Sequence, residues 1–306
     1  MAAVYTAAFR RSKVEQRPLG ATGLRVSLVG LGAGRIGGEE TSDADVDRLV
    51  SAALDAGVTL VDTAPSYGAS EERLGRALAG RRERIVLSTK VGYGVPGVAD
   101  WTGPVIAAGI DAALGRLRTD RIDLVHLHSC DLWTLQNSGV VEALVRAVES
   151  GKARVAAYSG EGDALAWALS SGAFGAVQCS VSVVDQGVLD GAVREASERG
   201  MGVLAKRSLG NAPWRFSERP AEEDVAMAWD RFRALRLDPG GLAWPALFTR
   251  FAAFAPGVSA LLIGTASAAH LLDAVSAVEQ GPLEIARAAN LRAAFAREGH
   301  RWSGRI

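Results

Sequence analysis

The chain has 306 residues, of which 48% are hydrophobic, enough to bury a large core within one domain. Its 34 basic and 34 acidic residues cancel, so it lacks the electrostatic footprint of a protein that binds nucleic acid or an anionic membrane. No apolar run reaches the roughly 18 residues of a membrane span, and residues 1–11 lack the apolar core of a secretory signal. The two cysteines, Cys130 and Cys179, cannot form a disulfide framework. We therefore expect a cytoplasmic protein that acts on a small molecule.

The beginning of the chain is expected to be separate from the fold. Residues 1–16 show no clear period and are predicted to form a flexible N-terminal segment, with one domain spanning residues 17–306. Residues 17–27 read as a β-hairpin, with Gly20 and Gly23 in its turn.

From residue 26 onward, short β-rich runs alternate with helical patterns. Ser42 or Asp43 is expected to cap the first helix, which Gly57 ends. Eight such repeats predict a single (β/α)₈ TIM barrel with its active site at the carboxyl ends of the strands; a doubly wound sheet is the alternative. The strands are expected at 26–30, 58–61, 85–90, 122–128, 155–159, 176–181, 202–206 and 259–264. The later helices are expected at 71–79, 104–117, 140–150, 163–170, 188–199, within 221–254, at 267–278, and, as an extra C-terminal helix, at 283–298.

A glycine-rich stretch follows the first barrel strand. Residues 32–37, Gly-Ala-Gly-Arg-Ile-Gly, match the Gly-x-Gly-x-x-Gly pattern of dinucleotide-binding loops. In such loops a helix opens within the glycines, whereas here the helix waits until Ser42 or Asp43, and Glu39 and Glu40 would repel phosphate. We therefore interpret the stretch as a flexible loop at the top of the first strand.

Two histidines alternate on one strand. His126 and His128 would face the same side, as His-x-His metal pairs do in some barrel hydrolases. The chain has four histidines in total, and the other two, His270 and His300, fall in the last helix and the tail. The ligand set of a metal-dependent hydrolase is therefore missing, and we expect no metal. His126 is expected inside the barrel, and His128 is the better functional candidate.

Four polar side chains lie at the tops of successive strands. Asp62 and Tyr67 follow the second strand, Lys90 ends the third and His128 ends the fourth, so they can converge on one spot. An ammonium close to a phenol favours the phenolate and lowers its pKa. Asp62 would hold Lys90, and His128 would donate a hydrogen bond to a substrate carbonyl oxygen. Tyr67 could then protonate that oxygen; since no side chain carries hydride, a nicotinamide must deliver it.

These residues resemble the aldo-keto reductase superfamily over almost the whole chain. The matching features are the hairpin, the Asp-Thr-Ala-x-x-Tyr-Gly signature at residues 62–68, the Ser-Thr-Lys strand end at 88–90, and Ile-Asp-Leu-Val-His-Leu-His at 122–128. The resemblance implies an oxidoreductase that transfers hydride between NADPH, or alternatively NADH, and the carbonyl of an aldehyde or ketone. Its general acid would be Tyr67, supported by Asp62, Lys90 and His128. The alternative is a cofactor-binding regulatory subunit with little turnover, because the family also contains ion-channel subunits.

The resemblance also implies where the cofactor binds. The family's Ser-Asn pair falls on Ser159 and Gly160, its glutamine on Gln178, and its aromatic stacking residue near Lys206. The adenosine phosphate site falls near His270, without its usual lysine or arginine. The implied cofactor contacts are Gly34, Arg35, Asp62, Ser159, Gly160, Gln178, Lys206, Arg207, Ser208, Leu209, Gly210, Gly264, Thr265, Ala266, Ser267 and His270.

Loop residues after strands three and four either wall a substrate pocket or simply pack. They are Tyr93, Trp101, Cys130 and Trp133. Because specificity lies in such variable loops, the sequence leaves the substrate open, and it leaves the oligomeric state open as well.

Overall fold

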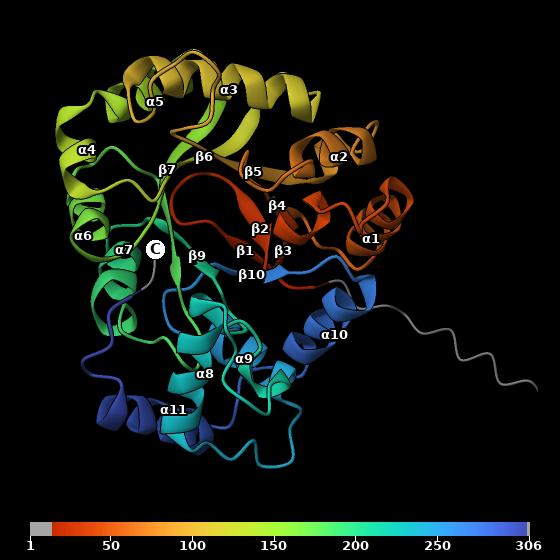
Figure 1. Cartoon of the computed structure of the whole chain (residues 1–306), viewed down its shortest axis with the longest axis vertical. Coiled ribbons are helices and arrows are strands. Elements are labelled where there is room, and N and C mark those ends of the chain that lie inside the picture. The colour runs from red at the N-terminus through yellow and green to blue at the C-terminus, as the bar shows by residue number, and fades with distance from the viewer. Residues whose placement is uncertain (1–13, 305–306) are drawn as a thin grey trace, which may run out of the picture.

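The computed structural model describes residues 14–304, within which eight parallel strands close into a barrel in the order β10-β3-β4-β5-β6-β7-β8-β9 (Figure 1). The predicted (β/α)₈ barrel is confirmed, and the doubly wound alternative was wrong, because that sheet would stay open. The strands are β3 (Val29–Gly32), β4 (Leu60–Asp62), β5 (Val86–Val91), β6 (Ile122–His128), β7 (Ala153–Ser159), β8 (Ala176–Ser180), β9 (Gly202–Lys206) and β10 (Ala260–Gly264).

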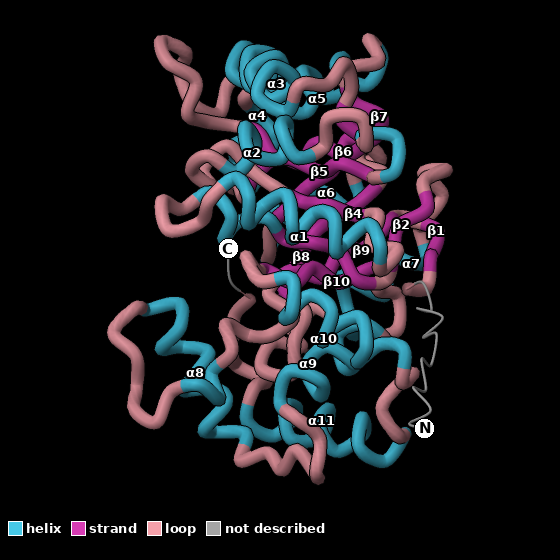
Figure 2. The backbone as a smooth tube through the Cα atoms, turned by 90° about the vertical axis from the view of Figure 1, so that its right-hand side faces the viewer, coloured by secondary structure: helices cyan, strands magenta, loops and turns pink. Residues whose placement is uncertain are grey.

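Helices surround the barrel, and Figures 1 and 2 show them packed around the ring of strands. The first helix has the predicted cap: Ser42 Oγ accepts from Asp45 N, and the Asp45 carboxylate accepts from Ser42 N. The α-helices are α1 (Asp43–Asp55), α2 (Ser70–Ala77), α3 (Gly103–Leu117), α4 (Leu132–Asn137), α5 (Val140–Glu149), α6 (Gly162–Ser170), α7 (Arg194–Glu198), α8 (Glu223–Leu235), α9 (Trp244–Ala253), α10 (Ala268–Glu279) and α11 (Ile285–Glu298). None of the helices in the described part of the chain is long and apolar enough to cross a membrane.

Two helical segments differ from the sequence prediction. The helix expected at 188–199 opens with a π-turn at Leu189–Val193 before α7. By contrast, the helical segments expected within 221–254 are found as α8 and α9. The short helix α4 was not expected, although Asp131 accepts from Thr134 N and so caps it as an N-cap aspartate should.

The N-terminal hairpin covers one end of the barrel, as Figure 2 shows from the side. Strands β1 (Gln16–Pro18) and β2 (Arg25–Ser27) pair antiparallel, and the hairpin's Leu19 and Leu24 pack with inward side chains of the barrel strands. Gly20 has φ +53°, and a Cβ there would lie 2.3 Å from Gly200 O, so the turn needs glycine. The hairpin therefore closes the amino ends of the strands and leaves the carboxyl ends for the site.

Two predicted boundaries at this end were wrong. The strand expected at 26–30 is divided, because Ser27 Oγ donates to Val29 O at 2.6 Å and bends the chain between β2 and β3. The ordered fold also starts before Arg17: Val14 is 2% exposed and its N–H donates to Ala56 O. The remainder of the predicted flexible segment, residues 1–13, lies outside the described residues.

The glycine-rich stretch after β3 is a 3₁₀ helix, η1 (Ala33–Gly37), instead of the predicted flexible loop. Ser70 Oγ donates to Ala33 O at 2.9 Å, and Arg73 donates to the carbonyls of Ile36 and Gly38. A Cβ on Gly37 would lie 1.6 Å from Tyr67 O, so the glycine allows η1 to press against the loop that carries Tyr67. These contacts fix both segments at the top of the barrel.

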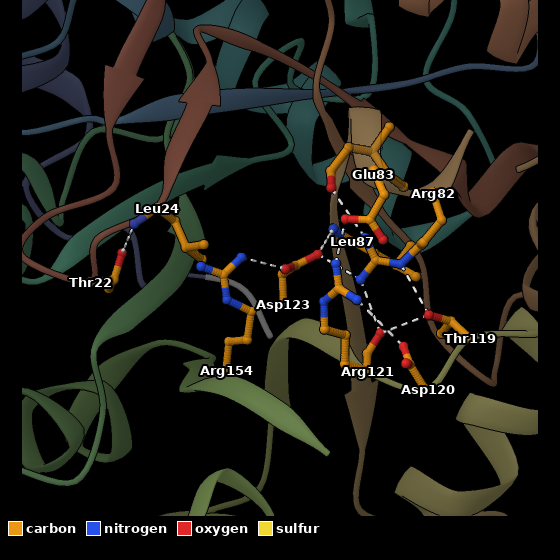
Figure 3. Close-up of polar contacts among 11 residues, drawn as sticks. Thr22, Leu24, Arg82, Glu83, Leu87, Thr119, Asp120, Arg121, Asp123 and Arg154 are labelled. Atoms are coloured by element: carbon orange, nitrogen blue, oxygen red, sulfur yellow. Dashed lines mark hydrogen bonds and ion pairs between the residues drawn. The ribbon is translucent and has the colours of Figure 1, made fainter. Parts of the chain in front are cut away.

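Ion pairs and a backbone hydrogen bond at the opposite end join strands β5, β6 and β7 (Figure 3). Asp123, near the start of β6, accepts from Arg82 at 2.7 Å, from Arg154 at 3.0 Å and from Leu87 N at 2.8 Å. Its side chain is only 2% exposed, so each of these bonds satisfies a buried charge. The amino ends of the strands therefore contribute to stability, whereas the active site of such barrels lies at the carboxyl ends.

Candidate functional site

The carboxyl ends of three adjacent strands carry the predicted constellation. Asp62 is the last residue of β4, instead of lying in the loop after it, and His128 is the last residue of β6. Lys90 lies between them near the end of β5, paired in register with His126. Tyr67 lies in the loop between β4 and α2. The structure thus brings all four side chains to one place.

The centre of the site is a buried ion pair. Lys90 Nζ lies 2.6 Å from Asp62 Oδ2 and donates to Thr63 O at 2.8 Å. The other carboxylate oxygen, Oδ1, accepts from Ser88 Oγ at 2.7 Å and from Gln178 Nε2 at 3.2 Å. Burial opposes both charges, but the pair overcomes it: Lys90 lowers the pKa of Asp62, and Asp62 with Tyr67 raises the pKa of Lys90. Both groups are therefore charged at neutral pH.

Tyr67 lies against this pair. The Lys90 ammonium is 4.8 Å from the centroid of the Tyr67 ring, and the ring of His128 stands perpendicular to it at 6.2 Å. On its other side, a Cβ on Gly34 would lie 3.6 Å from Tyr67 Cδ2, so η1 supports the ring. The phenol thus lies between a fixed cation and an imidazole.

The two histidines of β6 are neutral. Burial lowers the pKa of His126 to about 4, and its Nε2 shares a hydrogen bond of 3.1 Å with Ser88 Oγ inside the barrel. Burial, helped by the Lys90 charge, lowers the pKa of His128 to about 3. A neutral imidazole offers one N–H donor, which suits polarisation of a carbonyl. Within residues 14–304, no three His, Cys, Asp or Glu side chains cluster as a metal site would need.

The predicted carboxamide-binding residues also lie at this rim. Ser159 ends β7 and its Oγ donates to Gln178 Oε1 at 3.0 Å, so Ser159, Gln178 and Asp62 form one chain of hydrogen bonds. Gly160 cannot carry a side chain here, because a Cβ would lie 2.3 Å from the Tyr158 hydroxyl, which itself donates to Cys130 O.

Glu161 was missed by the sequence analysis. It is 3% exposed; its Oε1 accepts from Ser180 N at 2.7 Å and lies 3.7 Å from Lys206 Nζ. Its Oε2 has no hydrogen-bond partner among residues 14–304. Burial raises the pKa of this carboxyl to about 7, although Lys206 opposes the rise. Its only sequence signal was an acid directly after the Ser159-Gly160 strand end.

Two predicted cofactor-binding segments follow β9 and β10. Arg207 adopts φ +53° and its guanidinium lies 3.3 Å from the Asp224 carboxylate. Ser208 Oγ donates to Leu262 O at 2.8 Å, which ties the loop to β10, and a Cβ on Gly210 would lie 2.6 Å from Val184 Cγ2. Leu209 is half-buried between them. The backbone of this loop is therefore fixed, and two cations lie at its start: Lys206, the last residue of β9, and Arg207, the next residue.

After β10, the backbone turns into the N-terminus of α10. Ser267 caps this helix, accepting from His270 N, and Thr265 Oγ1 accepts from Ser267 N at 2.9 Å. Gly264 is exposed with no atom within 4 Å of where its Cβ would be, and Ala266 is half-buried. Gly34 and Arg35, which are consecutive residues of η1, are both exposed. Open glycine backbone, hydroxyls and a helix N-terminus form a donor set that fits the phosphates of a dinucleotide.

The four predicted pocket residues separate into two groups. Tyr93 stacks on His128 with ring centroids 5.6 Å apart, and Trp101 packs against Tyr93 at 5.7 Å. Cys130 instead lies in the hydrophobic core at 3% exposure, where burial raises the pKa of its thiol to about 12. Trp133 points outward on α4, 67% exposed. Of the two alternatives for these residues, Cys130 fits simple packing, whereas Tyr93 lies beside His128 and Trp101 beside Tyr93.

Comparison with known proteins places this site in a family. The model of the aldo/keto reductase family matches residues 28–295. L-galactose dehydrogenase of Arabidopsis thaliana is 27% identical over 88% of this chain and 89% of its own length. The 6-dehydroglucose reductase of Novosphingobium aromaticivorans is 37% identical, over 47% of this chain and only half of that protein.

Solved structures agree on the fold. A candidate aldo-keto reductase from Pseudomonas aeruginosa superposes with a TM-score of 0.71, 29% identity and coverage of 88% of this chain and 97% of that one. The holo form of an aldo-keto reductase from Bacillus halodurans reaches a TM-score of 0.79 at 24% identity, covering 92% and 96%, and supports the fold alone. The expected resemblance is confirmed: the chain belongs to the aldo/keto reductase family, whose members are oxidoreductases that act on carbonyl or alcohol substrates with a nicotinamide cofactor.

Proposed function

We propose that this enzyme reduces the carbonyl of an aldehyde or ketone, with Tyr67 as general acid and NADPH as the preferred cofactor. The observation that carries the proposal is the buried Lys90–Asp62 pair, 2.6 Å apart, beside the ring of Tyr67. Burying a charged pair costs desolvation free energy, and charged groups buried in this way cluster at functional sites. Here the pair holds a positive charge next to a phenol.

Each side chain has a separate role in this mechanism. Tyr67 gives its proton to the carbonyl oxygen, and the Lys90 ammonium stabilises the phenolate that remains. Asp62 keeps Lys90 charged and in position, since its carboxylate lies 2.6 Å from Nζ. His128, neutral because its pKa is near 3, donates a hydrogen bond to the same oxygen. A reduced nicotinamide, when bound, supplies the hydride that the carbonyl carbon accepts. Run in reverse, the Tyr67 phenolate takes the proton of an alcohol.

The rim residues would hold the cofactor. In this proposal Ser159 and Gln178 would bind the carboxamide, and Lys206 would stand where relatives have an aromatic stacking residue. The loop from Arg207 to Gly210 and the start of α10 would hold the phosphates, with Gly34 and Arg35 facing them from η1. The 2′-phosphate would lie near Thr265, Ser267 and His270, which supports NADPH over NADH.

The relatives suggest where to look for the substrate. L-galactose dehydrogenase, 6-dehydroglucose reductase and the L-glyceraldehyde 3-phosphate reductase of Escherichia coli are all named for sugars or a sugar phosphate. We infer that sugar-derived aldehydes and their alcohols belong in the first substrate panel, beside simple aldehydes and ketones.

The test is turnover of that panel with NADPH and with NADH, monitored by the absorbance of the reduced nicotinamide. We expect reduction of at least one carbonyl class, retained after dialysis against a chelator. Tight cofactor binding without turnover of any panel member would favour the regulatory-subunit alternative. Nicotinamide-dependent turnover that is lost on chelation and restored by zinc would contradict the metal-free mechanism.

A further inference from the structure

We propose that Tyr93 is a positioning residue that fixes the tautomer of His128, so that Nε2 carries the proton that is donated to the substrate. This inference rests on the proposed function, in which His128 donates to a carbonyl oxygen. The observation behind it is the direct hydrogen bond between the Tyr93 hydroxyl and Nδ1 of His128.

The first step concerns protonation. Burial and the nearby Lys90 charge lower the pKa of His128 to about 3, so at neutral pH its ring carries one proton on one of two nitrogens. A carbonyl oxygen only accepts hydrogen bonds, so the nitrogen that faces it must be the one with the proton. An imidazole that exchanges between tautomers would present a nitrogen lone pair to the substrate part of the time. That lone pair would repel the carbonyl oxygen.

The second step identifies what selects the tautomer. Tyr93 Oη contacts Nδ1 of His128, and its hydroxyl also has the geometry to donate to Ser66 Oγ at 3.0 Å, so two acceptors compete for one phenolic proton. Burial raises the pKa of Tyr93, so the phenol keeps its proton and can donate it. A neutral imidazole nitrogen is a better acceptor than a serine hydroxyl, and Ser66 is exposed, so water can satisfy it instead. The Tyr93 hydroxyl therefore donates its proton to Nδ1 of His128, and the imidazole carries its own proton on Nε2.

The third step concerns the orientation of the imidazole. The rings of Tyr93 and His128 are nearly parallel, 27° apart with centroids at 5.6 Å, so the phenol also limits rotation of the imidazole. Trp101 packs on the far side of Tyr93 at 5.7 Å and covers Gly92, where a Cβ would lie 2.1 Å from the indole. The bond to Tyr93 uses Nδ1 of His128, so Nε2 is the ring nitrogen left to bind a substrate.

The test separates the hydroxyl from the ring. Tyr93→Phe keeps the stacked ring and removes the bond to Nδ1. With the protein labelled with nitrogen-15 histidine and no substrate present, the His128 signals are assigned by their loss in His128→Gln. We expect the wild type to show the Nε2–H tautomer and Tyr93→Phe to show a mixture of both. His126, bonded to Ser88, should keep its own signals in both proteins.

Ser66→Ala is the matched control. It removes the other partner of the Tyr93 hydroxyl, and His128 should stay Nε2–H in this variant. An Nδ1–H tautomer in the wild type, or an unchanged Nε2–H tautomer in Tyr93→Phe, would overturn the proposal.

Kinetics provide a second readout. We expect Tyr93→Phe to lower kcat by about tenfold, equivalent to about 1.4 kcal/mol in the barrier, with little change in KM. In a His128→Gln background the same change should cause no further loss, because Tyr93 acts through His128. An equal loss of kcat in that background would contradict the proposal. The labelling result needs no turnover, so the absence of activity on every carbonyl would refute the proposed function without affecting the tautomer assignment.

Discussion

The ammonium of Lys90 lies 2.6 Å from Oδ2 of Asp62, and the two side chains are only 1% and 5% exposed. Each charge is tolerated in the barrel because of the other, since an isolated buried ion would cost several kcal/mol. The pair also receives hydrogen bonds from Ser88 and Gln178, so no oxygen of Asp62 is left unsatisfied. The same contact therefore supports both the stability of the barrel mouth and the charge beside Tyr67.

Removing Lys90 should affect stability and catalysis together. Lys90→Met leaves the Asp62 carboxylate buried without its cation, which should lower the free energy of unfolding by about 3–5 kcal/mol and abolish turnover. Denaturant unfolding and steady-state kinetics measure the two effects. The double variant Lys90→Met with Asp62→Asn removes both charges and should regain much of the stability but no activity. Wild-type stability in the single variant would show that the ion pair is unimportant to folding.

Tyr67→Phe should separate catalysis from binding. The substitution removes only the hydroxyl, so turnover should fall by about 10²–10⁴-fold, the range for loss of a general acid. Cofactor affinity, measured by quenching of protein fluorescence, should stay at the wild-type value. Carbonyl reduction within a factor of a few of wild type would exclude Tyr67 as the proton donor.

Glu161 predicts a pH dependence of stability. Burial raises the pKa of this carboxyl in the folded state to about 7, from an ordinary value of 4.5. The folded state thus holds the proton more tightly than the unfolded state, so the contribution of Glu161 is fully present below pH 4.5 and is lost as the pH rises through 7. Relative to Glu161→Gln, the wild type should lose a few kcal/mol across this window, about 1.4 kcal/mol for each pKa unit.

Unfolding both proteins in denaturant at several pH values measures this difference. The depressed pKa values of His126 and His128 act in the opposite direction, but both proteins contain these residues, so the comparison isolates Glu161. Glu142→Gln, on the exposed side of α5, is the control and should leave stability nearly unchanged at each pH. A constant difference between wild type and Glu161→Gln from pH 4.5 to 7 would refute the assignment.

The amino end of the barrel should affect stability alone. Asp123→Asn removes the charge that binds Arg82 and Arg154 (Figure 3) and should lower the free energy of unfolding by about 3 kcal/mol. Turnover per folded molecule should stay the same, because the site lies at the other end of the strands. Asp120→Asn is the matched control: its ion pair with Arg121 is exposed, so the loss should be below about 1 kcal/mol. Reduced kcat in folded Asp123→Asn would show that the two ends are coupled.

The sequence predicted the barrel because its strands are short β-rich runs bounded by glycines. This pattern involves only residues that are close together in the sequence. It also predicted that Asp62, Tyr67, Lys90 and His128 meet, since they end adjacent strands and barrel topology fixes that adjacency. Both predictions required only local pattern and strand order.

The contacts that refine the site depend on tertiary structure and could not be predicted in this way. Gln178 reaches Asp62 from 116 positions away, and the carboxyl of Glu161 becomes buried only when Ser180 and Lys206 close around it. The glycines of η1 predicted mobility, yet Arg73 donates to the carbonyls of Ile36 and Gly38 and holds this segment in place. Such partners share no sequence period, so their pairing appears only in the fold.

We expect the choice between NADPH and NADH to depend on the start of α10. A 2′-phosphate is normally bound by arginine or lysine, whose charge-assisted hydrogen bonds are about twice as strong as neutral ones. Here Thr265, Ser267 and the exposed His270 surround the helix N-terminus, and Thr265 Oγ1 lies 3.5 Å from His270 Nδ1. Hydroxyls, a helix dipole and an imidazole can bind the phosphate, but each does so more weakly than an arginine.

We therefore predict that NADPH binds more tightly than NADH, with less discrimination than in a relative that has an arginine at this position. His270→Ala should weaken NADPH binding and leave NADH binding unchanged, because in the proposed binding mode only the 2′-phosphate would reach this side chain. His300→Ala, exposed in the C-terminal tail, is the matched control and should change neither affinity. Fluorescence titration of the three proteins with both cofactors measures the preference. Tighter binding of NADH, or a preference that His270→Ala leaves intact, would show that the phosphate is bound elsewhere.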